Sequence, residues 1–270
     1  MLVVHTLSAQ AEQVNIPTGA SPSSVSSSQP LIEVPEEIAP DMIETQVQID
    51  PLNSPHPVPW NWVLASHAEL TATETVGLRY YRSQSLVSPD GNYAAYSRLQ
   101  MQGQPELYNS RVTSIMFLEN LQTGDLRTIT PSSPLADNPL VSSEAGDVPG
   151  TFAILMPISW SPSSDRLLAR QFEGMFNTGD ASDYAVIWDR QSNQVSTLAP
   201  QGIDYTNAVL LGWSQTNPDQ VLFRAGVLGD ENWPILAVDF HGDTALAFED
   251  EPIVYGQAVN QVWTGPQARW

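Results

Sequence analysis

The chain has 270 residues, and its 30 Asp and Glu outnumber its 10 basic residues, all of them Arg, to give a formal net charge of −20. A surface of this sign repels nucleic-acid phosphates and anionic lipid headgroups, so the charge disfavours a nucleic-acid or membrane-surface role. The absence of Cys excludes disulfides, Cys-ligated metals and thiol nucleophiles, and is compatible with reducing and oxidising compartments alike. No apolar run approaches the ~18 residues of a membrane-spanning helix, so no transmembrane segment is predicted.

Residues 1–57 form an acidic arm rich in Ser and Pro. The arm has too little apolar surface to offset the entropy of ordering it, so we expect it to be disordered and the folded domain to span residues 58–270. Met1–Ala11 contains a short apolar run followed by a small-x-small triplet. Two interpretations stay open for it: the remnant of an export signal, or an arbitrary chain terminus.

Three similar units follow the arm, near residues 78–130, 152–199 and 207–248. Each contains four short apolar segments separated by turn residues, which predicts four strands joined by antiparallel hairpins. The middle segments, such as Leu167–Ala169 and Val221–Phe223, are apolar at consecutive positions, as in sheets buried on both faces. Four-strand repeats of this length are typical of β-propellers.

The first turn of each unit supports the same interpretation. It reads Ser-Pro-Asp-Gly at Ser88–Gly91, Ser-Pro-Ser-Ser-Asp at Ser161–Asp165 and Thr-Asn-Pro-Asp at Thr216–Asp219. With the strand that follows and a later Thr-Gly-Asp-like turn, these segments resemble the repeats of TolB-like β-propellers. The third copy departs furthest from the motif. The resemblance implies a propeller fold and protein partners at a cell envelope, and therefore periplasmic or other export.

Three units cannot close a ring, because propellers begin at about four blades. We therefore expect a fourth, composite blade, with Ile253–Trp263 as its inner strand and Trp62–Thr75 beside it. If this blade does not form, an open sheet edge remains.

No motif typical of an enzyme is present: the sequence lacks a Gly-x-Ser-x-Gly elbow, a His-Glu-x-x-His pair, a phosphate-binding Gly loop and a Lys for Schiff-base chemistry. His56 and His241 fall in segments expected to be solvent-exposed. His67 is expected to be a satisfied structural histidine; an acid–base or metal role is its alternative.

The loops between the second and third strands of the units carry acids that should share one edge of the fold. A ring of carboxylates there could hold Ca²⁺ or attract a basic partner segment; the alternative is a solvated acidic surface. Its members are Glu106, Asp180, Asp183, Asp230 and Glu231, joined by Asp137, Glu144 and Asp147 from a long link.

Arg170 and Arg224 occupy matched positions at the ends of second strands. They could bind an anionic ligand, but pairing with neighbouring carboxylates is the simpler expectation. Trp160, Trp188 and Trp213 are expected to pack between units, and Trp233 is the candidate for an exposed stacking platform.

These features favour a non-catalytic protein-binding or scaffold propeller without a metal or other cofactor. One alternative is a small propeller hydrolase or lyase that acts on a carbohydrate with paired carboxylates. Another is a structural subunit that docks into a larger complex through an open edge.

Overall fold

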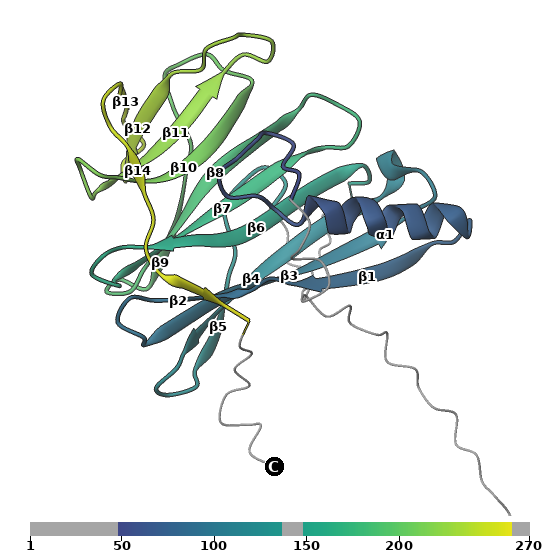
Figure 1. Cartoon of the computed structure of the whole chain (residues 1–270), viewed down its shortest axis with the longest axis horizontal. Helices are drawn as coiled ribbons and strands as arrows, with labels where there is room; N and C mark the ends of the chain where they lie inside the picture. Colours follow the sequence, from purple (N-terminus) through teal and green to yellow (C-terminus); the bar gives the residue numbers. More distant parts are fainter. Residues whose placement is uncertain (1–47, 137–147, 261–270) are drawn as a thin grey trace, which may run out of the picture. The chain divides into compact units, whose positions relative to one another are not determined.

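The computed structural model of the chain describes residues 48–136 and 148–260, and these are mostly β (Figure 1). One α-helix, α1 (Trp60–Ala72), precedes the strands, and a short 3-10 turn covers Leu107–Asn109. The strands are β1 (Gly77–Arg82), β2 (Ser85–Val87), β3 (Tyr93–Gly103), β4 (Arg111–Asn120), β5 (Leu126–Ile129), β6 (Thr151–Trp160), β7 (Arg166–Met175), β8 (Ala181–Asp189), β9 (Gln194–Leu198), β10 (Asn207–Ser214), β11 (Gln220–Gly226), β12 (Ile235–Asp239), β13 (Thr244–Leu246), β14 (Pro252–Ile253) and β15 (Gln257–Val259).

The three repeats are three antiparallel meanders, as the turn pattern predicts. The first is β2-β3-β4-β5, with β1 continuing the line of β2 along β3; the second is β6-β7-β8-β9; the third is β10-β11-β12-β13. A single parallel bridge, Val112 to Phe152, joins the first two meanders into one sheet. Within the described residues neither sheet closes on itself.

The first turns of the first two units share the same side-chain hydrogen bonds. The Ser88 hydroxyl donates to Asp90 Oδ1 at 2.6 Å and accepts from the Tyr93 N–H at 3.0 Å. In the second meander Ser161 likewise donates to Asp165 at 2.6 Å and accepts from the next strand. Gly91, at φ +70°, has no counterpart glycine there, and Ser164 takes the same left-handed conformation at φ +61°.

The core lies between consecutive meanders, in two clusters of buried side chains. Trp160 and Trp188 pack edge-on between the first and second meanders, with ring centroids 6.3 Å apart, and Trp213 is buried between the second and third. These tryptophans are therefore packing residues, as expected. A third cluster places Trp62 and Val63 of α1 against Leu99 and Phe152 of the sheet.

The prediction of a composite fourth blade is wrong. Residues 62–72, expected as a strand, are helical. Trp62, Val63, Ser66 and Leu70 are buried on one side of the helix, because residues three or four positions apart share a helix face. The C-terminal strands do not pair with this segment. The part of the expected inner strand beyond Asn260 lies outside the described residues.

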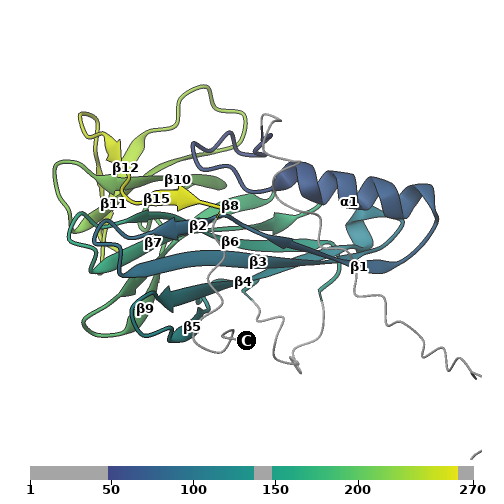
Figure 2. The same ribbon diagram turned by 60° about the horizontal axis from the view of Figure 1, so that its bottom comes forward.

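The C-terminal segment instead runs along the first strands of all three meanders (Figures 1 and 2). Ile253 of β14 pairs with Trp213 of β10. Tyr255 then accepts the Trp160 N–H of β6 at 2.9 Å, and β15 pairs antiparallel with β2 through Gln257 and Val87. The C-terminal segment thus forms two short strands, each of which pairs with the edge of an existing sheet.

Candidate binding site

Four of the predicted acids lie in exposed loops at one edge of the meanders, as expected. Glu106 is in the β3–β4 connection, Asp180 in the β7–β8 turn, and Asp230 and Glu231 in the β11–β12 loop. No group of three or more His, Cys, Asp or Glu side chains in residues 48–136 and 148–260 is placed to hold a metal ion. The geometry of the described acids therefore gives no support to a Ca²⁺ site. Asp137, Glu144 and Asp147 lie outside the described residues.

Arg170 pairs with neighbouring carboxylates, which confirms the simpler expectation for it, and it does not present its charge to a ligand. The prediction that Asp183 belongs to the exposed edge is wrong. Both side chains are fully buried, and Arg170 Nε donates to Asp183 Oδ1 at 2.7 Å. The second carboxylate oxygen of Asp183 accepts the Leu210 N–H at 2.8 Å. Burial raises the pKa of Asp183 to about 6, although the charge of Arg170 opposes the shift.

Arg170 also binds Asp50, a residue that the sequence places in the arm. Arg170 Nη1 donates to Asp50 Oδ2 at 2.5 Å and to the His56 carbonyl at 2.7 Å. Asp50 further accepts the N–H groups of Leu52, Ser54 and Val58. Burial alone would raise the pKa of Asp50, but Arg170 and these donors outweigh it and the pKa is lowered. Residues 48–57 are therefore part of the folded body.

His56 also departs from its expected solvent-exposed state. It is half-buried, and its Nε2 lies 2.8 Å from the Leu211 carbonyl of β10. Burial lowers the pKa of His56. The imidazole thus fastens the 48–58 segment to the third meander. His67 bonds to the Pro105 carbonyl at 3.0 Å, which agrees with a structural role.

Arg224 and Trp233 lie apart from the Arg170 cluster. Arg224 is half-buried in β11 between Val209 and Ile235, and no ion pair to it is found among the described residues. Trp233 is only half-exposed: its Nε1 donates to the Val227 carbonyl at 3.2 Å. Its ring covers Gly226, where a Cβ atom would come within 2.4 Å of the indole. The tryptophan therefore packs on its own loop.

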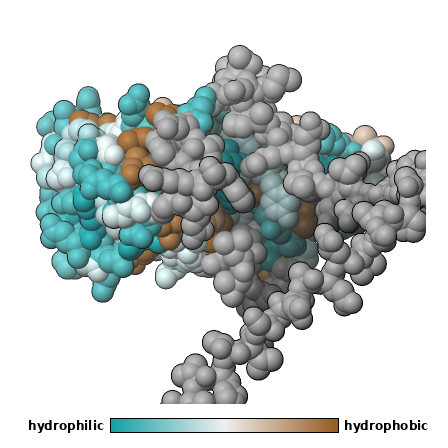
Figure 3. Space-filling model, turned by 90° about the horizontal axis from the view of Figure 1, so that it is seen from below, coloured by the Kyte–Doolittle hydropathy of each residue, from teal (hydrophilic) through white to brown (hydrophobic). Residues whose placement is uncertain are grey.

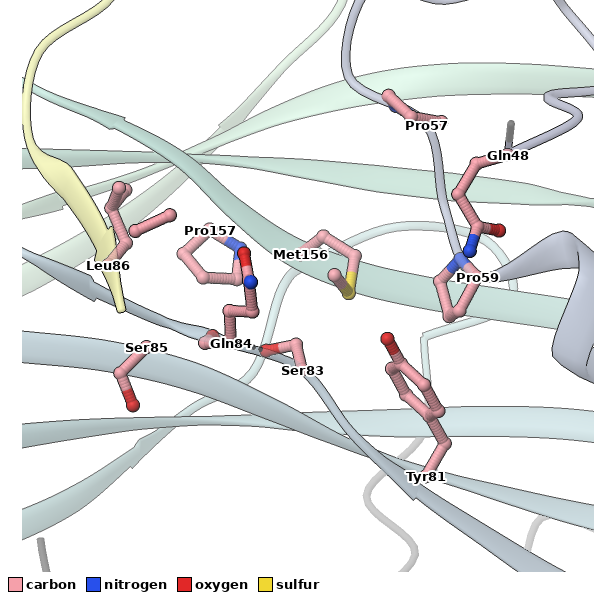
Figure 4. Close-up of a pocket in the computed structure, with 11 residues that line it drawn as sticks. Gln48, Pro57, Pro59, Tyr81, Ser83, Gln84, Ser85, Leu86, Met156 and Pro157 are labelled. Carbon is pink, nitrogen blue, oxygen red and sulfur yellow. Dashed lines mark hydrogen bonds between the residues drawn. The ribbon is translucent and has the colours of Figure 1, made fainter. Parts of the chain in front are cut away.

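A cavity of about 390 Å³ lies between the first strands of the first two meanders (Figure 4). One wall is Tyr81 of β1 and residues 83–86, which cover the β1–β2 link and the start of β2. The opposite wall is Met156 and Pro157 of β6. Ala258 of β15 borders the cavity, and Gln48, Pro57 and Pro59 complete it. Sequence analysis missed this site, because its residues come from four segments that share no motif.

The chemistry of the cavity is neutral. Its lining residues include no carboxylate, imidazole or guanidinium group. The polar groups are serine hydroxyls, the Tyr81 phenol and the amides of Gln48 and Gln84 (Figure 4). The Oε1 atom of Gln48 is buried and has no hydrogen-bond partner among the described residues, so it does not face the open space of the cavity. The cavity is suited to a neutral ligand with polar groups and some apolar surface, because its lining combines hydroxyls and amides with proline, methionine and leucine side chains.

A second hollow, on the third meander, is lined by Leu246, Phe248 and their neighbours, and Phe248 is 75% exposed. In Figure 3 the coloured surface at the left of the view is largely hydrophilic, with separate apolar patches.

Two findings bear on how the chain is classified. No helix in the described parts of the chain is both long enough and apolar enough to cross a membrane. No family model matches the chain, and no curated protein matches it significantly.

Proposed function

We propose that the chain is a non-catalytic protein-binding module, built as an open β-propeller, that holds an extended segment of a partner protein in the cavity beside Tyr81 and Met156. The observation that carries the proposal is the way the molecule already binds extended chain. Its C-terminal segment is held on the first strands of the meanders by backbone pairing, at β14 on β10 and at β15 on β2. The cavity lies where that track reaches Ala258.

The lining of the cavity supports binding over catalysis. General acid–base chemistry needs a titratable pair within reach of a substrate, and glycoside hydrolysis needs two carboxyl groups about 5–9.5 Å apart. The lining offers hydroxyls, amides and proline rings instead, a composition suited to recognition. The exposed acids of the loop edge disfavour an acidic partner and would speed the approach of a basic one.

The likeness of the first turns to TolB-like repeats supports the propeller and protein-binding parts of the proposal. The serine–aspartate bonds at Ser88 and Ser161 give those turns a shared physical basis. A place at the cell envelope follows from the same resemblance, and we propose it as the compartment in which partners are met.

The test uses the full chain and short random peptides displayed on phage. Peptides enriched on the wild-type protein should bind Ala258→Trp at least about tenfold more weakly, because an indole at this position fills the cavity. Gln257→Trp is the matched control. Gln257 and Ala258 are adjacent exposed residues of β15, but their side chains point to opposite faces and Gln257 does not line the cavity.

The expected result is a loss of binding in Ala258→Trp alone, with both variants as stable as the wild type. Equal binding to both variants would place the peptides elsewhere and overturn the assignment of the cavity. No enrichment over a protein-free surface would overturn the proposed function itself.

A further inference from the structure

The third meander has a packed face and an outer face. Its strands bury Leu210, Phe223 and Val238 against the second meander. Successive side chains of a strand point to opposite faces of the sheet, so Ala237 of β12 points away from this core. Ala245 of β13 pairs with Ala237 and shares its outer face. The described strands include no fourth meander that could stack on this face, and β13 is the last strand of its sheet (Figure 1).

The hollow on the third meander lies on this outer face and has a volume of about 530 Å³. Ala237, Ala245 and Ala247 line it, together with Leu246 and Phe248. The Leu246 side chain is 58% exposed and the Phe248 side chain is 75% exposed. The small alanine side chains leave room for an incoming apolar side chain, and Phe248 offers it an aromatic contact.

One available carboxylate lines the hollow. The Asp250 carboxylate accepts hydrogen bonds from the hydroxyls of Ser214 and Thr216 and from the N–H groups of Gln215 and Thr216, so its work is to hold the rim. Glu249 also lines the hollow and is exposed. In the described part of the chain no ion pair to Glu249 is found. Its charge is therefore available to a partner.

The charge of the third meander selects among occupants. Residues 201–260 contain nine Asp and Glu residues but a single Arg, Arg224. A second copy of the chain would bring the same negative charge to the contact, which disfavours self-association through this face. A segment that carries Lys or Arg gains from the same field, both in its rate of approach and in its choice of register.

We propose, beyond the proposed function, that the outer face of the third meander is a second docking surface, and that its occupant is a basic segment of a partner protein. The segment places one apolar side chain in the hollow beside Phe248 and a Lys or Arg next to Glu249. An apolar anchor in a pocket, surrounded by polar contacts, is the usual arrangement of a binding hot spot.

The probe is a panel of synthetic peptides in which one Leu, Phe or Trp is flanked on each side by two Lys residues. Peptides with the same anchors flanked by Ser or by Glu serve for comparison. The full chain should bind the Lys-flanked peptides most tightly. Phe248→Ala should weaken that binding about tenfold, because it removes the aromatic contact of the anchor. Fluorescence anisotropy at low ionic strength measures the affinities, and denaturant unfolding checks that the variant is folded.

Two leucines provide a matched pair for the apolar contact. Leu246→Ala and Leu228→Ala remove the same atoms from side chains that are 58% and 59% exposed. Leu246 lines the hollow and Leu228 does not. The Lys-flanked peptides should bind Leu246→Ala about threefold more weakly and Leu228→Ala as tightly as the wild type.

Two glutamates provide a matched pair for the charge. Glu249→Gln and Glu251→Gln remove the same charge from exposed positions two residues apart, but Glu251 does not line the hollow. Glu249→Gln should weaken the Lys-flanked peptides about threefold, as expected for an exposed ion pair, and Glu251→Gln should have a smaller effect. Equal effects would mean that the peptides respond only to net charge, and the assigned site would be wrong.

Three further outcomes would overturn the inference. Equal binding to Phe248→Ala and the wild type would place the peptides elsewhere. Equal affinity for Ser-flanked and Lys-flanked peptides would contradict a basic partner. A wild-type dimer that Phe248→Ala converts to a monomer in sedimentation would assign the surface to a second copy of the chain.

The docking surface can be tested apart from the cavity, because the hollow and the cavity share no lining residue. Ala258→Trp should leave the affinity for the Lys-flanked peptides unchanged. A loss of affinity in Ala258→Trp would place these peptides in the cavity and overturn the second surface. Failure of the Phe248→Ala test would leave the proposed function standing, since that function depends on peptides that respond to Ala258→Trp.

Discussion

The cluster around Arg170 and the cavity around Gln48 share one structural segment, residues 48–59, but have opposite chemistry. In the cluster every charge is buried and paired: Arg170 meets Asp50 and Asp183, and the spare oxygens accept backbone N–H groups. The lining of the cavity contains no charged group, and its polar groups are hydroxyls and amides.

The difference shows why titratable groups with strongly shifted pKa values need not mark a functional site. A fully satisfied ion cluster has no capacity left for a ligand, so its work is to hold the 48–58 segment against the sheet. A neutral pocket lined by hydroxyl and amide groups has such capacity. The following predictions test this division, from the largest expected effect to the smallest.

Arg170→Met should lower the free energy of unfolding by about 3–5 kcal/mol, because it leaves Asp50 and Asp183 buried without their partner. Arg224→Met is the control. It changes the matched position in the third meander, which is half-buried, and should cost less than about 1 kcal/mol. Denaturant unfolding of both variants measures the difference. Equal losses would mean that the buried cluster contributes no more to stability than a half-buried arginine without an ion pair.

Gly256→Ala should destabilise the protein by about 1–3 kcal/mol by disturbing the C-terminal segment beside the cavity. Gly256 has φ +108°, and a Cβ atom there would lie 2.9 Å from both the Trp160 ring and the Val87 carbonyl. Gly91→Ala is the comparison, since Gly91 has φ +70° but nothing within 4 Å of the added atom. Thermal unfolding should show a smaller loss of stability for Gly91→Ala than for Gly256→Ala. The difference would measure the steric crowding of the added Cβ atom at Gly256, beyond the strain of a positive φ. Equal losses would argue against a tightly held segment.

The free energy of unfolding should depend on pH partly through the protonation of Asp183. Its pKa in the folded state, about 6, lies above the ordinary value of 3.8, so the folded protein takes up a proton first as the pH falls. Protonation of Asp183 therefore raises the free energy of unfolding as the pH falls from about 6 toward 4. This stabilisation is lost as the pH rises through 6.

Asp183→Asn should remove that contribution. The lowered pKa of His56 acts in the opposite direction, and so does the lowered pKa of Asp50 below its ordinary value. His56, Asp50 and Arg170 all remain in the variant. The effect of Asp183 is therefore the difference between wild type and variant in the free energy of unfolding, measured from pH 7 to pH 4. Parallel curves would show that Asp183 does not titrate in this window.

The smallest effect is expected at the loop edge. Glu106→Gln and Asp230→Asn should each change the free energy of unfolding by less than about 0.5 kcal/mol, because both side chains are exposed. Asp250→Asn removes the same charge from a buried carboxylate that accepts bonds from Ser214 and Thr216, and should cost about 1–3 kcal/mol. A stability loss at Glu106 as large as at Asp250 would show that the edge acids are structural.

Much of the local architecture could be predicted. The three meanders, their hairpin turns and the packing role of Trp160 and Trp213 follow from patterns within a few residues. In a turn such as Ser88–Gly91 the hydrogen bonds that define the structure join residues no more than five positions apart. Interactions of that range leave a signature in the sequence.

The candidate site could not be predicted, because long-range partners decided it. Asp50 and Arg170 are 120 residues apart, and Asp50 lies in an acidic stretch that by composition favours disorder. Likewise, nothing local in Gln257–Val259 indicates that it pairs with β2 and not with a fourth blade. The sequence by itself determined the repeats and turns, whose contacts are local. Only the tertiary structure decided which charges are buried together and where a cavity remains, because both depend on how distant segments pack.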